Sequence, residues 1–327
     1  LPDEVELAIE AELDKPLKTV EAGSIGKAKR VEDASGRYIE FCKSTIPAVM
    51  NFRGLKLVVD CAHGATYNTA PHVFEELGAE VIPMGNLPDG LNINREVGST
   101  SPQALCAAVV REGADLGIAF DGDGDRVLMV DAKGSLVDGD QLLYVIARSR
   151  VQAGAFRGEV VGTLMSNLGL EHALGRLGIG FARTQVGDRY ILEYLKQTDG
   201  ILGGEPSGHI ICRDRTSTGD GIVSALQVLA ALQRLDTTLE SICAEVWHYP
   251  QVLINVRLAE RRDLVGLPAV QDAIFLAEKE LAGQGRVLLR PSGTEPLVRV
   301  MVEGVDRSQV ESLARRLADV VQEQARV

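Results

Sequence analysis

The sequence predicts an α/β protein in which two consecutive α/β domains with mainly parallel sheets are followed by a smaller α+β domain. Two observations carry this prediction. From residue 54 onward, short apolar strands alternate with helical stretches, an order typical of parallel sheets covered by helices. After Tyr249-Pro250 the order becomes strand, helix, strand, strand, helix, which indicates a separate α+β unit.

Composition restricts the class of protein. The chain has 327 residues, enough for two to four domains, and its 45% apolar and 24% charged residues are ordinary for a globular protein. A net charge of −12 and an aromatic content of 4% argue against a nucleic-acid partner. No apolar stretch approaches the ~18 residues that span a membrane, and no signal peptide is visible. The five cysteines include no C-x-x-C pair, so we expect a reduced, cytoplasmic protein.

Residues 1–36 are expected to be the tail of a first domain whose body lies upstream, together with a linker. Residues 1–15 have the spacing of an acidic amphipathic helix that Lys15-Pro16 ends, and a basic connector covers residues 23–30. The chain begins at Leu rather than Met, and this helix has few neighbours nearby in sequence. Both features favour a domain that continues upstream.

The two α/β domains are predicted at residues 37–133 and 134–247. In the first, a helix at 36–49 precedes strands at 55–60, 80–83 and 116–120 and helices at 69–77 and 102–112. In the second, strands are expected at 159–163, 180–184, 200–203 and 209–212, and helices at 139–149, 168–177, 190–197 and 221–235. Asp138, Asp188 and Asp220 are expected to cap helices. The two domains share little sequence identity, so the repeat that we infer is one of topology.

The last domain is predicted at residues 248–327 as a βαββα unit. Its strands are expected at 252–256, 286–290 and 298–302, and its helices at 269–281 and 307–323. Apolar residues recur at helical spacing along the final helix, which predicts that one of its faces packs on the core.

The segment Ala119-Phe-Asp-Gly-Asp-Gly-Asp-Arg126 carries three carboxylates at alternate positions, directly after a buried strand. Two like charges ~5 Å apart repel by roughly 3 kcal/mol at an effective dielectric near 20, and Arg126 alone cannot offset three such pairs. Asp121, Asp123 and Asp125 are therefore candidate Mg²⁺ ligands. A polar turn and a phosphatase with an aspartyl nucleophile remain alternatives. Residues 60–65 are a weaker candidate for a segment that supports the metal-binding loop.

The segment Gly203-Gly-Glu-Pro-Ser-Gly-His209 joins two predicted strands. Glu205, Ser207 and His209 present a carboxylate, a hydroxyl and an imidazole together, and such a set can hold vicinal sugar hydroxyls. His209 is either a proton carrier or a hydrogen-bonded loop histidine. The alternative for the whole segment is a glycine-rich hairpin with polar side chains.

The segment Arg290-Pro-Ser-Gly-Thr-Glu-Pro296 lies between two strands of the last domain. It offers a positive charge, two hydroxyls and free backbone N–H groups, and a second arginine follows on the next strand. This set suits a dianionic phosphate. The candidate residues are Arg290, Ser292, Gly293, Thr294 and Arg299. The alternative is a turn with an incidental salt bridge.

Taken in order, the motifs D-G-D-G-D-R, G-E-x-S-G-H and R-x-S-G-T-E-P-x-x-R resemble those of the α-D-phosphohexomutase family over the whole chain. Residues 36–43, 162–167 and 299–304 are most similar to the branch that acts on glucosamine phosphates. The resemblance implies an isomerase that interconverts glucosamine 6-phosphate and glucosamine 1-phosphate in a cleft among four domains. A phosphoserine in the first domain would donate its phosphoryl group, and glucosamine 1,6-bisphosphate would be intermediate and activator.

The resemblance also implies roles for the motif residues. Asp121, Asp123 and Asp125 would hold one Mg²⁺ ion, and Arg126 would touch the transferring phosphoryl group. Glu205 and Ser207 would hold sugar hydroxyls with His209 beside them. The non-reacting phosphate would be held by Arg290, Ser292, Gly293, Thr294 and Arg299. The expected partner is a small hexosamine phosphate, with neither nucleic acid nor membrane, and pairing with a second copy of the chain is left open.

The chain departs from the family pattern in two ways. The serine of the family lies in a Ser-His-Asn-Pro loop, and these 327 residues contain no such sequence. The nucleophile and a fourth metal ligand are therefore expected upstream, and this chain alone is expected to be inactive. Pro206 stands where a polar or small residue is expected, which weakens the choice of sugar. The alternatives are a phosphomannomutase or phosphoglucomutase of the same fold, a non-catalytic module binding Mg²⁺ and sugar phosphate, and a Mg²⁺-dependent phosphatase.

Overall fold

The computed structural model describes residues 3–260, 262, 264–292 and 295–325. The chain forms two compact units, Leu1–Ser35 and Gly36–Val327. The first unit contains the helix α1 (Asp3–Leu13) and the short 3₁₀ helix η1 (Ala22–Ser24). Within this chain the apolar side chains along α1 are exposed, so the helix is not part of a core here.

The second unit begins with a five-stranded sheet in the order β2-β1-β3-β4-β5. The strands are β1 (Lys56–Asp60), β2 (Glu80–Met84), β3 (Leu116–Phe120), β4 (Val127–Asp131) and β5 (Leu136–Val137). The helices of this region are α2 (Ala34–Ser44), η2 (Ala65–Tyr67), α3 (Ala70–Glu76) and α4 (Gln103–Glu112). The first three strands are parallel, and β4 and β5 are antiparallel to their neighbours.

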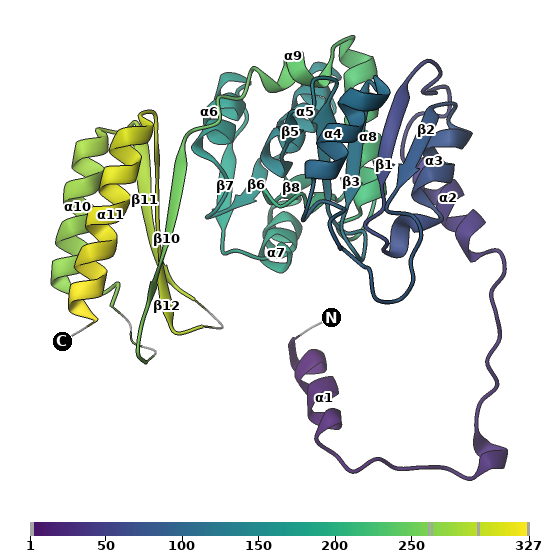
Figure 1. Ribbon diagram of the computed structural model, residues 1–327, viewed down its shortest axis with the longest axis horizontal. Coiled ribbons are helices and arrows are strands. Elements are labelled where there is room, and N and C mark those ends of the chain that lie inside the picture. The colour runs from purple at the N-terminus through teal and green to yellow at the C-terminus, as the bar shows by residue number, and fades with distance from the viewer. Residues whose placement is uncertain (1–2, 261, 263, 293–294, 326–327) are drawn as a thin grey trace. The chain divides into compact units, whose positions relative to one another are not determined.

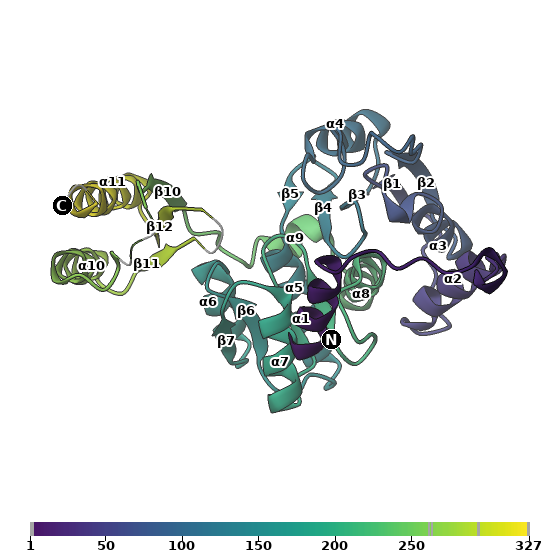
Figure 2. The same ribbon diagram turned by 90° about the horizontal axis from the view of Figure 1, so that it is seen from below.

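Both faces of this sheet are covered, as the continuous apolar strands predict. Helix α4 lies over one face (Figure 2). There Val58 of β1 packs with Leu105 and Val109 of α4. On the other face its neighbours Leu57 and Val59 belong to the large core that also includes α3, α5 and α8. The alternation along β1 follows from the period of two residues in a strand.

A second sheet follows in the order β7-β6-β8-β9. Its elements are α5 (Gly139–Gln152), β6 (Val160–Thr163), α6 (Leu168–Arg176), β7 (Phe181–Thr184), α7 (Asp188–Thr198), β8 (Leu202–Gly204), β9 (Ile210–Cys212), α8 (Gly221–Leu235) and α9 (Leu239–Cys243). In both sheets the spatial order is second, first, third, fourth, with the fourth strand antiparallel. The predicted repeat of topology is thus confirmed. The acidic loop and the 203–209 segment both connect the third and fourth strands of their sheets.

The last region is a three-stranded antiparallel sheet in the order β10-β12-β11. Its elements are β10 (Gln251–Arg257), α10 (Pro268–Leu281), β11 (Gly285–Pro291), β12 (Leu297–Gly304) and α11 (Arg307–Gln324). Helices α10 and α11 lie side by side on one face of the sheet (Figure 1). Val298, Val300 and Val302 of β12 form the core with them. This is the predicted βαββα unit.

Two details of the predicted helices are corrected by the structure. Helix α2 ends at Ser44 rather than at 49, because Pro47 disfavours helical geometry in the residue before it. Asp188 does not cap α7: Gly187, with φ 131°, takes the capping position and Asp188 is the first helical residue. Asp138 and Asp220 do cap α5 and α8. Within the described part of the chain, no helix has the length and apolar character that crossing a membrane requires.

Candidate functional site

The acidic loop between β3 and β4 gathers three carboxylates. One oxygen from each of Asp121, Asp123 and Asp125 lies within 4.8 Å of the others. The strands on both sides of the loop are buried along their whole length, which fixes the ends of the loop. Asp121 is buried, Asp125 is half-buried and Asp123 is exposed. The cluster is therefore open to solvent on the side of Asp123.

The electrostatics of this cluster fit a divalent cation. Burial raises the pKa of Asp121 to about 6; the backbone N–H of Arg126 opposes this shift, and the charges of Asp125 and Asp123 add to it. Oδ1 of Asp125 is buried and has no hydrogen-bond partner among the described residues. A bound cation would offset the repulsion among the three carboxylates and would give Oδ1 of Asp125 a partner. All-oxygen ligation suits Mg²⁺.

Arg126 supports the loop mainly through its backbone. Its N–H donates to Oδ1 of Asp121 at 3.1 Å, and the N–H of Gly124 donates to the same oxygen at 3.2 Å. The guanidinium Nε lies 3.7 Å from Oδ2 of Asp121 and from Oδ1 of Asp125, longer than a hydrogen bond. With the side chain 44% exposed, the guanidinium is able to contact an anion that approaches the loop.

Residues 60–65 brace the acidic loop through the main chain. The N–H of Ala65 donates to the carbonyl of Gly122 at 2.8 Å. A Cβ on Gly64 would lie 2.2 Å from the same carbonyl oxygen, so this close approach requires glycine. Asp60 is fully buried and its carboxylate accepts from the N–H groups of Ala62 (2.9 Å) and Gly98 (2.7 Å). His63 instead accepts from the N–H of Leu87 at 3.2 Å, which is a structural role.

Two neighbours of the acidic loop were missed by sequence reasoning. The side-chain oxygens of Thr66 and Asn94 are buried without a hydrogen-bond partner among the described residues. A Cβ on Gly122 would lie 2.9 Å from Nδ2 of Asn94, and one on Gly124 would lie 2.6 Å from the methyl group of Thr66. Neither residue belongs to a periodic pattern. The sequence therefore carries no signal that would place them here.

The acidic loop and the 203–209 segment pair directly. Arg126 and His209 form an isolated antiparallel bridge, and the N–H of Val127 donates to the carbonyl of Gly208 at 3.0 Å. Nδ1 of His209 lies 3.0 Å from Oδ2 of Asp125. Because a carboxylate only accepts hydrogen bonds, Nδ1 is the donor. The structure thus brings the predicted metal and sugar residues together.

Within the 203–209 segment, one oxygen of the Glu205 carboxylate already accepts a hydrogen bond. Its Oε1 accepts from the N–H of Gly187 at 3.0 Å, which ties the segment to the start of α7. The backbone N–H of Glu205 donates to the carbonyl of His209 at 3.0 Å and closes the turn. Ser207 at the tip of the turn is exposed. Glu205 and Ser207 are therefore placed where a sugar could reach them.

Arg290 and Arg299 face each other across β11 and β12 as directly opposite residues. Like charges at opposite positions destabilise a sheet. Nε of each guanidinium is buried without a hydrogen-bond partner among the described residues, and burial followed by the charge of Arg299 lowers the pKa of Arg290. A dianion would satisfy both side chains. The nearly buried Ser292 follows β11, whereas Gly293 and Thr294 lie outside the described residues.

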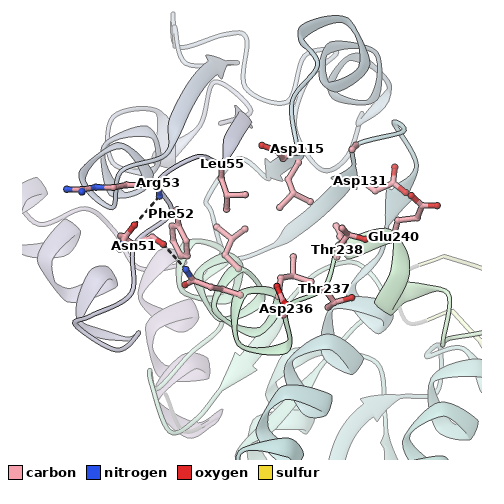
Figure 3. A pocket seen from close by; sticks show the side chains of 16 residues that line it. Asn51, Phe52, Arg53, Leu55, Asp115, Asp131, Asp236, Thr237, Thr238 and Glu240 are labelled. Carbon is pink, nitrogen blue, oxygen red and sulfur yellow. Dashed lines mark hydrogen bonds between the residues drawn. The ribbon is translucent and has the colours of Figure 1, made fainter.

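The structure does not join all three predicted sites by direct contacts. Among the described residues, no hydrogen bond or ion pair connects Arg290 or Arg299 to the acidic loop or to the 203–209 segment. A cavity of ≈ 370 Å³ lies elsewhere, at the opposite edge of the first sheet (Figure 3). Its lining includes Asp115, directly before β3, and Asp131 at the end of β4, so it is not part of the candidate site.

Comparisons with known families identify the domains of this chain. Three family profiles match successive parts of the chain. They are described as phosphoglucomutase/phosphomannomutase alpha/beta/alpha domain II at residues 36–134, alpha/beta/alpha domain III at residues 138–249, and the C-terminal domain at residues 253–320. The chain therefore belongs to the phosphoglucomutase/phosphomannomutase family, the α-D-phosphohexomutases.

The chain is also similar to curated phosphoglucosamine mutases. The chain is 60% identical over 322 residues to the phosphoglucosamine mutase of Aeromonas hydrophila and 61% identical over 321 residues to that of Methylococcus capsulatus. Each match covers 98% of this chain and 72% of the relative. These relatives are isomerases of the phosphohexomutase superfamily.

Solved structures show the same fold. The Aspergillus fumigatus N-acetylphosphoglucosamine mutase in complex with GlcNAc-6P and magnesium matches with a TM-score of 0.75 at 22% identity, over 90% of this chain and 66% of that one. A phosphoglucomutase/phosphomannomutase family protein from Burkholderia thailandensis matches with a TM-score of 0.71 at 21% identity, over 89% and 65%.

Proposed function

We propose that this chain is part of a phosphoglucosamine mutase, which interconverts glucosamine 6-phosphate and glucosamine 1-phosphate. The observation that carries the proposal is the 3.0 Å contact between His209 and Asp125, because it joins the acidic loop to the predicted sugar loop. A phosphoryl group held at the acids would then lie beside a sugar held at Glu205. The high identity to phosphoglucosamine mutases supports the choice of sugar.

Each residue of the acidic loop has a proposed part. Asp121, Asp123 and Asp125 would hold Mg²⁺, which when bound supplies positive charge to the transferring phosphoryl group. Arg126 would contact the oxygens of that phosphoryl group, since its side chain is 44% exposed and its Nε lies 3.7 Å from the nearest carboxylate oxygens. His209 would act as a positioning residue that orients the Asp125 carboxylate by donating from Nδ1.

The other two sites would hold the substrate. The second oxygen of the Glu205 carboxylate and the exposed hydroxyl of Ser207 would bind sugar hydroxyls. Arg290 and Arg299, with Ser292 and the predicted residues Gly293 and Thr294, would bind the phosphate that does not react. Positioning and charge stabilisation, rather than covalent chemistry by these residues, would account for their effect on the rate.

The covalent step is also a proposal. A phosphoserine would transfer its phosphoryl group to the free hydroxyl of the hexosamine phosphate, giving glucosamine 1,6-bisphosphate, and would regain a phosphoryl group from the other end of that sugar. Because residues 1–327 contain no Ser-His-Asn-Pro sequence, we expect these residues alone to produce no isomerisation, even with added bisphosphate. Clear turnover by residues 1–327 in a coupled assay would place the nucleophile among them.

Kinetics with the full-length enzyme test the choice of sugar. We expect kcat/KM for glucosamine 6-phosphate to exceed the values for glucose 6-phosphate and mannose 6-phosphate by at least ~10-fold, or roughly 1.4 kcal/mol. Glu205→Gln should change the ratios among the three sugars, whereas Arg290→Ala should weaken all three alike. Equal kcat/KM values for the three sugars would favour the second candidate, a phosphomannomutase or phosphoglucomutase, to which the matched family profiles also extend.

A further inference from the structure

Glu303, at the end of β12, is a charged residue that the proposed chemistry does not use. Its side chain is completely buried. Oε1 accepts from Nε of Arg286 at 2.6 Å and from the N–H of Leu168 at 3.0 Å, and Oε2 accepts from Nε2 of Gln251 at 3.0 Å. Leu168 begins α6, in the preceding α/β region. A buried carboxylate with this many partners fixes the relative positions of the groups that it bonds.

Arg286 strengthens the same contact. Its two terminal nitrogens donate to the carbonyls of Leu164 (2.9 Å) and Ser166 (2.7 Å). The planar guanidinium can make both bonds while its Nε bonds Glu303, which a lysine cannot do. The main chain of residues 164–168 is therefore hydrogen-bonded to side chains of both β11 and β12.

Asn167, within the same 164–168 segment, holds the connector that leads into β10. Its Nδ2 donates to the carbonyl of Tyr249 at 3.0 Å, and its Oδ1 accepts from the N–H of Tyr249 at 3.0 Å. A Cβ on Gly169 would lie 1.8 Å from the carbonyl oxygen of Trp247, so the connector is closely packed here as well. One short segment thus contacts both the sheet of the last region and the chain that leads to it.

The phosphate-binding arginines lie on the same two strands. Arg286 is directly opposite Glu303, and Arg290 is directly opposite Arg299. Because each pair is four residues from the other along its strand, all four side chains share one face of the sheet, with about 13 Å between the pairs at ~3.3 Å per residue. A rotation at Glu303 would therefore displace the two arginines together.

The first turn of α5 connects the 164–168 segment with the 203–209 segment. The N–H of Gly139 donates to the carbonyl of Pro206 at 3.1 Å. The next residue, Asp140, accepts at Oδ2 from the N–H of Asn167 at 2.6 Å. The first turn of α5 is therefore in contact with both the predicted sugar loop and the 164–168 segment.

We propose that Arg286 and Glu303 are positioning residues that hold Arg290 and Arg299 at the distance from Glu205 that a hexosamine phosphate requires. The proposal rests on the proposed function, because it needs the sugar and the phosphate to be held by different regions. A ligand that spans both regions gains affinity only if both can engage it at once. Inorganic phosphate, held by the arginines alone, should not depend on this distance.

Calorimetric titration of the full-length protein with glucosamine 6-phosphate and with inorganic phosphate tests the proposal. For Glu303→Gln we expect the Kd of the sugar phosphate to rise about tenfold while the Kd of phosphate changes less than about twofold. Glu280→Gln is the matched control, because it removes the 2.7 Å pair with Arg316 on the outer helices of the same region. This control should leave both constants unchanged.

The outcomes distinguish a failure of the proposed function from a failure of the positioning role. A parent protein that binds glucosamine 6-phosphate no more tightly than phosphate contradicts the proposed function. A parent that prefers the sugar phosphate, with the same preference in Glu303→Gln, contradicts the positioning role. If Glu303→Gln does not fold, Arg286→Lys replaces it, since lysine keeps the charge beside Glu303 but cannot reach both carbonyls. An unchanged preference in Arg286→Lys likewise overturns the proposal.

Discussion

Nδ1 of His209 lies 3.0 Å from Oδ2 of Asp125, although the two residues are 84 positions apart in the sequence. Each residue lies in the loop between the third and fourth strands of its sheet, and the two sheets have the same strand order. The contact therefore joins equivalent loops of a topological repeat. The same two loops also pair through the backbone, where Arg126 and His209 form an isolated antiparallel bridge.

The acidic loop should bind Mg²⁺ through Asp123, the most accessible of the three carboxylates. We expect Asp123→Ala to weaken Mg²⁺ binding at least tenfold in a calorimetric titration, because the remaining acids cannot complete an all-oxygen site. Asp115→Asn is the control. It changes an acid at the other end of β3 and should leave the affinity unchanged. Equal binding by the parent and Asp123→Ala would show that the acidic loop is not the metal site.

Two glycines of α6 should respond oppositely to alanine. A Cβ on Gly169 would lie 1.8 Å from the carbonyl oxygen of Trp247, whereas a Cβ on Gly175 has no atom within 4 Å. Gly169→Ala should lower stability by about 1–3 kcal/mol through forced displacement of the connector. Gly175→Ala should raise stability by about 0.5–1 kcal/mol, because alanine loses less backbone entropy in a helix.

Differential scanning calorimetry of the two variants checks this pair of predictions. The midpoint of the transition that contains α6 should fall for Gly169→Ala and rise for Gly175→Ala. A rise of similar size in both variants would mean that the connector can move away from α6 without loss. That result would also weaken the case for a closely packed junction at residues 164–168.

The stability of the protein should fall as pH rises because of Asp140. Burial, followed by the charge of Asp138, raises the pKa of the Asp140 carboxyl well above its ordinary value, while bonds from Asn167 and Ser166 and the charge of Arg183 oppose the shift. A folded-state pKa above the unfolded value means that the folded protein binds the extra proton. The contribution of Asp140 is therefore fully present below about pH 3.9 and is lost as pH rises through the folded pKa.

Asp140→Asn isolates this contribution. The amide resembles the protonated carboxyl, and its oxygen can still accept from the N–H of Asn167. The midpoint of thermal unfolding should be similar for the parent and the variant at pH 3.5 and higher for the variant at pH 8. A variant that is less stable than the parent at pH 8 would show that the carboxylate is charged and stabilising in the folded state.

The sequence was sufficient to predict elements whose signal is local. The continuous apolar run Leu116–Phe120 gave β3 and the long apolar period of Gly221–Leu235 gave α8, both with the observed bounds. The short strand β5 and the helix α9 were missed, because two and five residues are too few to show a period. Asp188 was predicted as a cap because Asp is favoured there, but Gly187 adopts the φ of 131° that precedes the helix.

The residues of the candidate site also differ in whether a local signal in the sequence could predict them. Asp121, Asp123 and Asp125 are close in the chain, so their convergence could be inferred from spacing and repulsion alone. The contact of the acidic loop with His209 depends on how two sheets pack, and periodicity contains no information about it. Thr66 and Asn94 lie beside the loop for the same reason. Tertiary packing, not local preference, selects these neighbours.

Gly219 should control the metal site through His209. A Cβ on Gly219 would lie 2.1 Å from Nε2 and 2.4 Å from Cε1 of His209, so alanine there must displace the imidazole ring. The displaced ring can no longer donate to Asp125, and the carboxylate loses the bond that orients it. Because loss of such an orienting partner costs roughly 10-fold or more in metal affinity, we expect Gly219→Ala to weaken Mg²⁺ binding to that extent.

A double-mutant cycle shows whether the effect of Gly219 passes through His209. In the His209→Ala background the ring is already absent, so adding Gly219→Ala should cause no further loss of Mg²⁺ affinity in calorimetric titrations. The single variants Gly219→Ala and His209→Ala should weaken binding by similar factors. Additive losses in the double variant would mean that Gly219 acts on the acidic loop by another route. An unchanged Mg²⁺ affinity in His209→Ala would show that the His209–Asp125 contact does not orient the metal ligand.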